Sequence, residues 1–222
     1  IGDGMSVNII FEDINAIYKG EKVSKQSYTM YEYILDYLED KDNGTAADTV
    51  RYFMGLTNGC KIRKSILAKK DCSNLDHGIN QSINKRFDSL SRKKVLAYCK
   101  KHGVSENVLF LTAYNYCVSV FANDDDILTT SIHSGRTDSR WNRIIGSLFI
   151  TYLYRYTRKA HETVPELLKR GGQQILKTMD CRLSTLHADE MFIQYQGDIL
   201  SIDEMGGAPV QREKLSLDSL PF

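Results

Sequence analysis

The sequence predicts a layered sandwich of the α/β class, with an α+β arrangement as the alternative at this point. Apolar residues recur at helical spacing in several segments. Two runs rich in aromatic and β-branched residues, 127–133 and 148–156, predict strands. The predicted helices between strands are long enough for crossover connections. This combination is typical of helices packed on a sheet.

The chain opens with Ile1-Gly2-Asp3-Gly4-Met5-Ser6, which leads directly into a predicted helix. Gly4 allows a tight turn, and Ser6 is the expected N-cap of this helix. An Asp-Gly pair before a helix is also typical of an ordinary turn, so this stretch alone does not define a site. The apolar face of the predicted helix comprises Val7, Ile10, Phe11, Ile14, Ile17 and Tyr18.

Five further helices are expected from periodicity, capping residues and glycine stops. The segment that opens at Ser105 is apolar nearly all round, so we expect it to be buried on all sides. The last helix begins at Val164-Pro165, with proline near its first turn. The five cover 27–40, 46–56, 89–102, the segment from 105 to 120, and the segment from 164 to 179.

The run 127–133 is predicted to be a central strand, and 148–156 a long one. Further strands are predicted at 83–87 and 191–196, and a turn at Gly206-Gly207. A short strand at 66–67 lies within a polar crossing loop, whose lysines and arginines fit either a solvated surface or an acidic partner. Leu215 and Leu217 are predicted to start a last strand.

Composition narrows the functional classes. The 222 residues carry a formal net charge of +1, which argues against a nucleic-acid surface. No apolar run is long enough to span a membrane, and no signal peptide is recognised. The five cysteines form no C-x-x-C pair, which indicates reduced thiols in the cytoplasm and no zinc site. The five histidines are expected to be structural or exposed.

Four landmarks follow one another in a fixed order: Gly2–Ser6, Tyr28–Tyr33, Ser134–Arg136 and Ile145–Arg155. Their order and spacing resemble the condensation domains of nonribosomal peptide synthetases. The first is similar to the end of the family motif H-H-x-x-x-D-G-x-S, and the second to Y-x-D-Y-A-x-W. The third matches S-G-R after a strand. The fourth matches I-G-x-F-V-N-T-x-x-x-R loosely.

This resemblance implies the chloramphenicol acetyltransferase-like fold of the CoA-dependent acyltransferase superfamily, a two-layer sandwich with two lobes. It implies that residues 1–82 end the N-terminal lobe and that 83–222 form a truncated C-terminal lobe. The second histidine of the motif, the family's central catalytic residue, would lie two positions before Ile1. We therefore expect the N-terminal half of the domain to be missing here and this segment alone to be inactive.

The resemblance also implies site residues. Asp3 is expected to form an ion pair with Arg136 that braces the loop, and Gly4 to present its backbone N–H near the reaction centre. A buried carboxylate needs a cationic partner, and guanidinium offers two parallel donors. The alternative is that the two residues never meet. The residues expected along the substrate tunnel are Ser6, Ser134, Gly135, Gly146 and Thr151.

The activity implied by the family is acyl transfer, in which an amine on one carrier protein attacks a thioester on another. Phosphopantetheine of the peptidyl carrier proteins would hold the substrates, and no cofactor or metal would bind directly. The other expected partner is the adenylation domain of the same assembly line, in the cytoplasm. Two alternatives stay open: another acyltransferase of the superfamily that uses free CoA thioesters or lipid alcohols, and a degenerate carrier-docking domain without catalysis.

Overall fold

The structure is a computed structural model of the chain, and it divides the chain into two compact units that are described separately here. The first unit draws on residues 1–35, 138–148 and 198–222, and the second on 36–137 and 149–197. Within these, the structure describes residues 2–23, 25–60, 83, 85, 91–181, 191–197 and 204–211.

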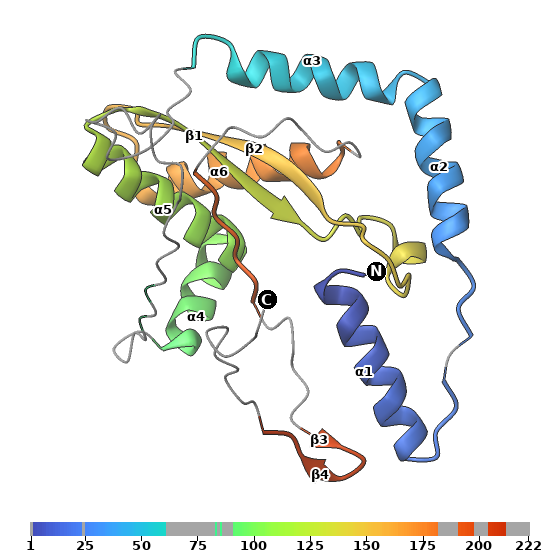
Figure 1. The fold of residues 1–222 in the computed structure, drawn as a ribbon. Coiled ribbons are helices and arrows are strands. Elements are labelled where there is room, and N and C mark those ends of the chain that lie inside the picture. The colour runs from blue at the N-terminus through green and yellow to red at the C-terminus, as the bar shows by residue number, and fades with distance from the viewer. Residues whose placement is uncertain are drawn as a thin grey trace, which may run out of the picture. The chain divides into compact units, whose positions relative to one another are not determined.

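The first unit is built around a small aromatic core. Trp141, Ile144 and Leu148 are fully buried there, and Tyr28, Met30 and Tyr33 pack against them. The rings of Tyr33 and Trp141 meet edge to face, with their centroids 5.2 Å apart. Its elements are α1 (Gly4–Tyr18), the start of α2 (Met30–Asp42), the short 3-10 helix η1 (Ser139–Trp141) and a hairpin of β3 (Glu204–Met205) and β4 (Ala208–Pro209) (Figure 1).

The β3–β4 hairpin is fastened to the end of α1. Lys19 forms an ion pair with Glu204 at 2.8 Å, and the backbone N–H of Gly206 donates to Asn15 Oδ1 at 2.8 Å. Gly206 and Gly207 both have positive φ, +58° and +87°, which glycine tolerates without a Cβ clash. The turn predicted at these two glycines is confirmed.

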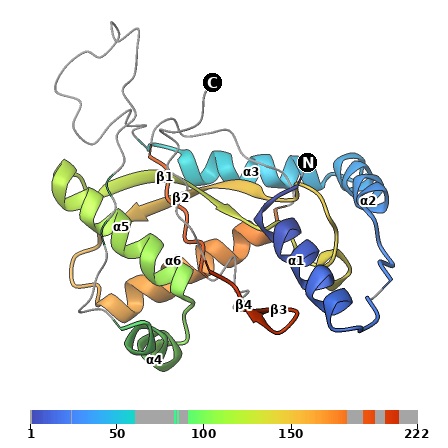
Figure 2. The same cartoon turned by 60° about the horizontal axis from the view of Figure 1, so that its bottom comes forward.

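The second unit contains a sheet covered by helices (Figure 2). Figure 2 shows α3 on one side of the β1–β2 pair and α5 and α6 on the other. The elements are α3 (Thr45–Thr57), α4 (Arg92–His102), α5 (Glu106–Ala122), β1 (Asp126–His133), β2 (Ile150–Thr157) and α6 (Val164–Met179).

Strand β1 has neighbours on both sides. It pairs antiparallel with β2 over its whole length, from Asp126 opposite Thr157 to His133 opposite Ile150. On its other side, Thr130 forms a parallel bridge with Phe192. The prediction that 127–133 is a central strand is therefore confirmed, whereas the strand predicted at 191–196 is reduced to this bridge.

The two faces of the β1–β2 pair are chemically different because side chains alternate along a strand. On the face toward α5, the hydroxyls of Tyr154 and Thr112 are 3.1 Å apart, and Thr129 donates to Asn115 Oδ1 at 3.2 Å. Both hydrogen bonds are buried. Three tyrosines with at most 2% exposure lie in a row along this face: Tyr152, Tyr154 and Tyr156.

On the opposite face, Arg155 binds the end of α3. Its Nε and Nη2 donate to the two carboxylate oxygens of Asp126 at 2.7 and 2.6 Å. Its Nη1 donates to the backbone oxygens of Leu56 and Asn58 at 2.9 and 2.8 Å. One guanidinium thus satisfies two carbonyls that the C-terminus of α3 leaves without helical partners.

Two further sequence-based predictions are wrong. The N-cap of α1 is Asp3 and not Ser6, which lies three residues further on inside the helix. The helix from 106 to 122 is not buried all round, because it rests on the sheet with one face only. Val108, Leu111 and Val118 are buried, whereas the far side is open: Tyr116, Val120 and Phe121 are 49%, 53% and 79% exposed.

The other described helices match their predicted ranges to within a few residues. The strands predicted at 66–67, at most of 83–87 and at 215–217 lie outside the described residues. The expected boundary between residues 82 and 83 adjoins such a segment and stays a prediction.

Candidate functional site

The start of α1 is held by a reciprocal pair of hydrogen bonds. Asp3 Oδ1 accepts from the backbone N–H of Ser6 at 2.9 Å, and the backbone N–H of Asp3 donates to Ser6 Oγ at 3.3 Å. This is the capping-box arrangement, which satisfies donors that a helix N-terminus leaves unpaired. Gly4 is the first residue of the helix.

The Ser6 hydroxyl links the first landmark to the fourth. It accepts from the backbone N–H of Gly146 at 3.0 Å. Its single proton has two acceptors within reach, the Gly146 carbonyl at 2.9 Å and Asp3 Oδ1 at 2.8 Å. Ser6 is only 1% exposed. A hydroxyl in this position ties together two backbones that are 140 residues apart in sequence.

The carboxylate of Asp3 makes a second long-range bond. Its Oδ2 accepts from the backbone N–H of Leu148 at 3.1 Å, while Oδ1 serves the helix cap. Gly146 lies between these two bonds, and a Cβ there would come within 2.7 Å of Met30 Sδ. Both carboxylate oxygens thus accept backbone N–H groups. Asp3 is therefore placed to hold the two backbone segments together and not to transfer a proton.

In the second unit, the Ser134-Gly135-Arg136 landmark forms a tight turn at the end of β1. Gly135 has φ +70° and donates its backbone N–H to His133 Nδ1 at 3.1 Å. The backbone N–H of Arg136 donates to Ser134 Oγ at 3.4 Å, and its Nη1 to the Ser134 carbonyl at 3.2 Å. Glycine is favoured here because the left-handed conformation strains other residues.

Thr151, the last expected tunnel residue, lies in β2 opposite Ile132 and is 8% exposed. The structure thus brings Asp3, Ser6 and Gly146 into one hydrogen-bonded cluster. The pairing of Asp3 with Arg136 joins the two units and stays a prediction.

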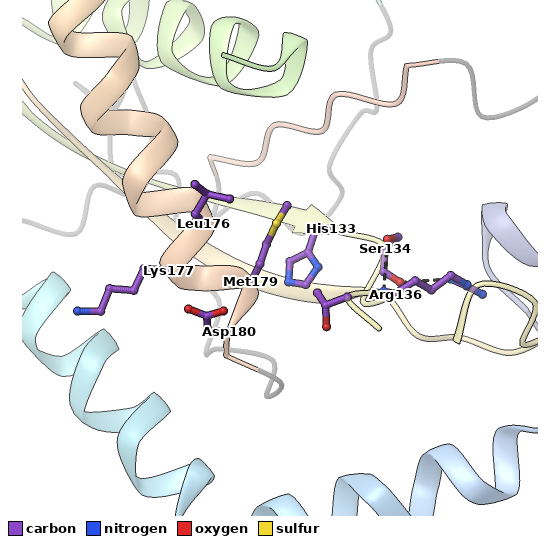
Figure 3. A pocket seen from close by; sticks show the side chains of 8 residues that line it. His133, Ser134, Arg136, Leu176, Lys177, Met179 and Asp180 are labelled. Atoms are coloured by element: carbon purple, nitrogen blue, oxygen red, sulfur yellow. Dashed lines mark hydrogen bonds between the residues drawn. The ribbon is translucent and has the colours of Figure 1, made fainter. Parts of the chain in front are cut away.

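A cavity of about 680 Å³ lies beside the same turn, within the second unit. Figure 3 shows His133, Leu176, Met179 and Asp180 among the side chains that line it. Lys177 points away from the ring, and its ammonium lies 5.0 Å from the centre of the Tyr52 ring. The lining residues are His133, Ser134, Arg136, Thr137, Leu176, Lys177, Met179 and Asp180.

The protonation state of His133 follows from its partners. Because Nδ1 accepts from the Gly135 N–H, that nitrogen carries no proton, and the neutral ring holds its proton on Nε2. Burial lowers the pKa of His133 from 6.5 to about 4, since it disfavours the charged form. Nε2 is itself buried, and no described residue forms a hydrogen bond with it.

This pKa predicts an acid-sensitive contribution to stability. Between pH 6.5 and about 4 the unfolded chain binds a proton at His133 that the folded chain does not, so stability falls as pH falls through this window. We expect a loss of about 2 kcal/mol between pH 7 and pH 5 from this group. The measurement is urea-induced unfolding at the two pH values.

The matched control for this prediction is His133→Asn. Its amide oxygen can still accept from the Gly135 N–H, but the side chain does not titrate. Other titrating groups are common to both proteins, so the difference between them isolates His133. An equal pH dependence in the two proteins would contradict the prediction.

Within the part of the chain that the structure describes, no His, Cys, Asp or Glu residues gather in a group that could hold a metal ion. The described helices also include none with the length and apolar character needed to cross a bilayer.

Comparison with known protein families gives a match over residues 1–183 to a family described as Condensation domain. Surfactin synthase subunit 1 from Bacillus subtilis is 23% identical over 176 residues, which is 79% of this chain and 5% of the relative. Gramicidin S synthase 2 from Brevibacillus brevis is 23% identical over 180 residues, which is 78% of this chain and 4% of the relative. The chain therefore spans a small fraction of these relatives.

Solved structures of condensation domains are similar to this chain in fold. The condensation domain of the monacolin K polyketide synthase MokA superposes with a TM-score of 0.65 at 16% identity, covering 82% of this chain and 44% of that one. The first condensation domain of the calcium-dependent antibiotic synthetase gives 0.64 at 12% identity, covering 87% of this chain and 46% of that one. At these identities the likeness concerns the fold, and it confirms the predicted α/β sandwich.

Sequence reasoning missed two features of the site. It assigned Ser6 to the tunnel but did not foresee its bonds to Gly146. It also treated His133 as one of five histidines without a special role, although this residue ends a strand directly before Ser-Gly-Arg. That position was the available signal, since a strand end before a tight turn is a common place for functional residues.

Proposed function

The chain belongs to the condensation-domain family, and on this premise we propose that the complete protein joins a carrier-bound acyl or peptidyl thioester to a carrier-bound amine. The amine nitrogen attacks the thioester carbonyl, and a tetrahedral oxyanion forms. The carbon–sulfur bond then breaks, and the thiol leaves with a proton, so that an amide and a free carrier thiol result. Phosphopantetheine on the carrier proteins holds both substrates, and an adenylation domain supplies them.

The observation that carries this proposal is the hydrogen-bonded cluster of Asp3, Ser6 and Gly146. It joins the first and fourth landmarks, which were identified independently in the sequence. In our proposal the base that accepts the amine proton is the histidine of the family motif, in residues that precede Ile1. The cluster fixes the loop that would carry this histidine, and preorganised loops lower the cost of reaching the transition state.

Arg136 completes this arrangement in the proposal by pairing with Asp3. The Asp3 carboxylate holds two backbone N–H groups and would use its remaining acceptor capacity for the guanidinium. Gly4 would present its N–H toward the developing oxyanion, because donors preorganised at that position stabilise the transition state. Ser134, Gly135 and Thr151 remain proposed tunnel residues, and a cytoplasmic location is part of the same proposal.

The test is amide formation by the complete protein with two loaded carriers. Asp3→Asn removes the charge and replaces one oxygen that accepts a backbone N–H with an NH₂ group; we expect the rate to fall about a hundredfold, and circular dichroism checks that the variant folds. Arg136→Gln should cause a similar loss. If the two residues form one pair, the double variant loses no more than the worse single variant.

Additive losses would contradict the pair but not the activity. A matched control is Asp138→Asn, because Asp138 pairs with Arg140 in the 138–141 segment and lies outside the cluster. Offering free acyl-CoA in place of the loaded donor tests the other acyltransferase class. A folded complete protein that makes no amide with either donor would support a non-catalytic docking domain.

A further inference from the structure

We propose that the cavity beside β1 is a selectivity site for an aminoacyl side chain carrying an uncharged hydrogen-bond acceptor, best matched by a primary carboxamide. The inference rests on the proposed function, which supplies the aminoacyl substrates. It adds a residue, His133, and a substrate class that the four landmarks do not specify.

The first observation is a buried donor without an acceptor. His133 is neutral with its proton on Nε2, and no described residue accepts from this atom. An unsatisfied buried donor destabilises the folded chain, because the water that solvated it is not replaced by another acceptor. A ligand oxygen that reached Nε2 would recover this free energy, and a purely apolar ligand would not.

The second observation is space next to this donor. The cavity measures about 680 Å³, which is within the range of small-molecule sites. Nε2 is screened from solvent, so a ligand group reaches it by displacing a lining side chain. Met179 lines the same cavity as His133, and its flexible thioether adapts readily to a new neighbour.

The charges around the cavity favour an uncharged ligand group. The cationic groups are engaged elsewhere: Lys177 lies over the Tyr52 ring and Arg136 donates to the Ser134 carbonyl. Asp180, the acidic group of the lining, would repel a carboxylate. A carboxamide avoids this conflict because its oxygen can accept from His133 while its NH₂ can donate to the Asp180 carboxylate.

The test compares side chains of similar size on both carriers: glutaminyl, norleucyl and glutamyl. The complete protein should use glutaminyl at least about tenfold more efficiently than norleucyl on one of the two carriers, as expected for a recovered hydrogen bond to a buried donor. His133→Asn keeps the acceptor for the Gly135 N–H but removes the Nε2 donor. This variant should lose the preference for glutaminyl over norleucyl.

A readout that does not require catalysis is nuclear magnetic resonance of the ¹⁵N-labelled imidazole in the complete protein. N-acetylglutamine amide should shift the His133 Nε2–H signal, and N-acetylnorleucine amide should not. If no amide forms with any substrate, the proposed function is wrong. The titration still tests whether the cavity binds a carboxamide at His133. A preference for glutamyl, an unchanged preference in His133→Asn, or no selective shift would each overturn the inference.

Discussion

Replacing Arg155 with alanine is expected to lower the free energy of unfolding by about 3 kcal/mol, because it breaks a partly buried ion pair and removes the donor from two carbonyls at a helix end. The variant loses both bonds to Asp126 and leaves that carboxylate beside the half-buried Cys60. It also frees the carbonyls of Leu56 and Asn58, which then lack a donor at the end of α3. Urea-induced unfolding measures the change.

Two control variants separate geometry from charge. Arg158→Ala removes an arginine three residues away whose ion pair with Asp125 is exposed, and it should cost less than about 1 kcal/mol. Arg155→Lys keeps the charge but cannot reach two carboxylate oxygens and two carbonyls together, so most of the loss should remain. A loss in Arg155→Ala no greater than that in Arg158→Ala would refute the role given to this network.

The second large effect is expected from Gly171→Ala in α6, at about 3 kcal/mol of destabilisation, as for overpacking of a core. A Cβ at Gly171 would lie 2.5 Å from the Tyr154 hydroxyl oxygen and 2.9 Å from Thr112 Oγ1. Both hydroxyls are buried and bonded to each other at 3.1 Å, so neither can withdraw without losing its partner.

The neighbouring glycine is the matched control. A Cβ at Gly172 meets Val108 at 3.7 Å, an ordinary contact, so Gly172→Ala should stabilise the helix by up to about 1 kcal/mol. Combining Gly171→Ala with Tyr154→Phe removes the atom in the way and should cost less than the sum of the two changes. Equal effects of the two alanine substitutions would contradict this account.

The sequence was sufficient for the elements whose pattern is local. The helices at 46–56 and 164–179 were found from periodicity and end signals, and the structure places α3 and α6 there. The run 127–133 was identified as a strand from its β-branched residues and is β1. The family resemblance, carried by four short landmarks, is likewise confirmed.

What the sequence did not reveal depends on contacts between distant segments. Ser6 and Asp3 are both good N-caps by residue type, and the choice between them is tied to the Asp3 bond to Leu148. Which face of α5 stays exposed depends on how the helix packs on the sheet, and its apolar sequence does not show this. The orphaned nitrogen of His133 follows from one turn hydrogen bond and from the placement of α6.

The bond between Ser6 and Gly146 has a consequence for biosynthesis. When α1 leaves the ribosome, its long-range partner is 140 residues behind it. At synthesis rates of about 5–20 residues per second, the wait is roughly 7–28 s. Throughout this time the nascent helix displays Ile9, which is buried in the folded protein. The first unit is therefore the part of the nascent chain that we expect chaperones to engage before its segment 138–148 has been translated.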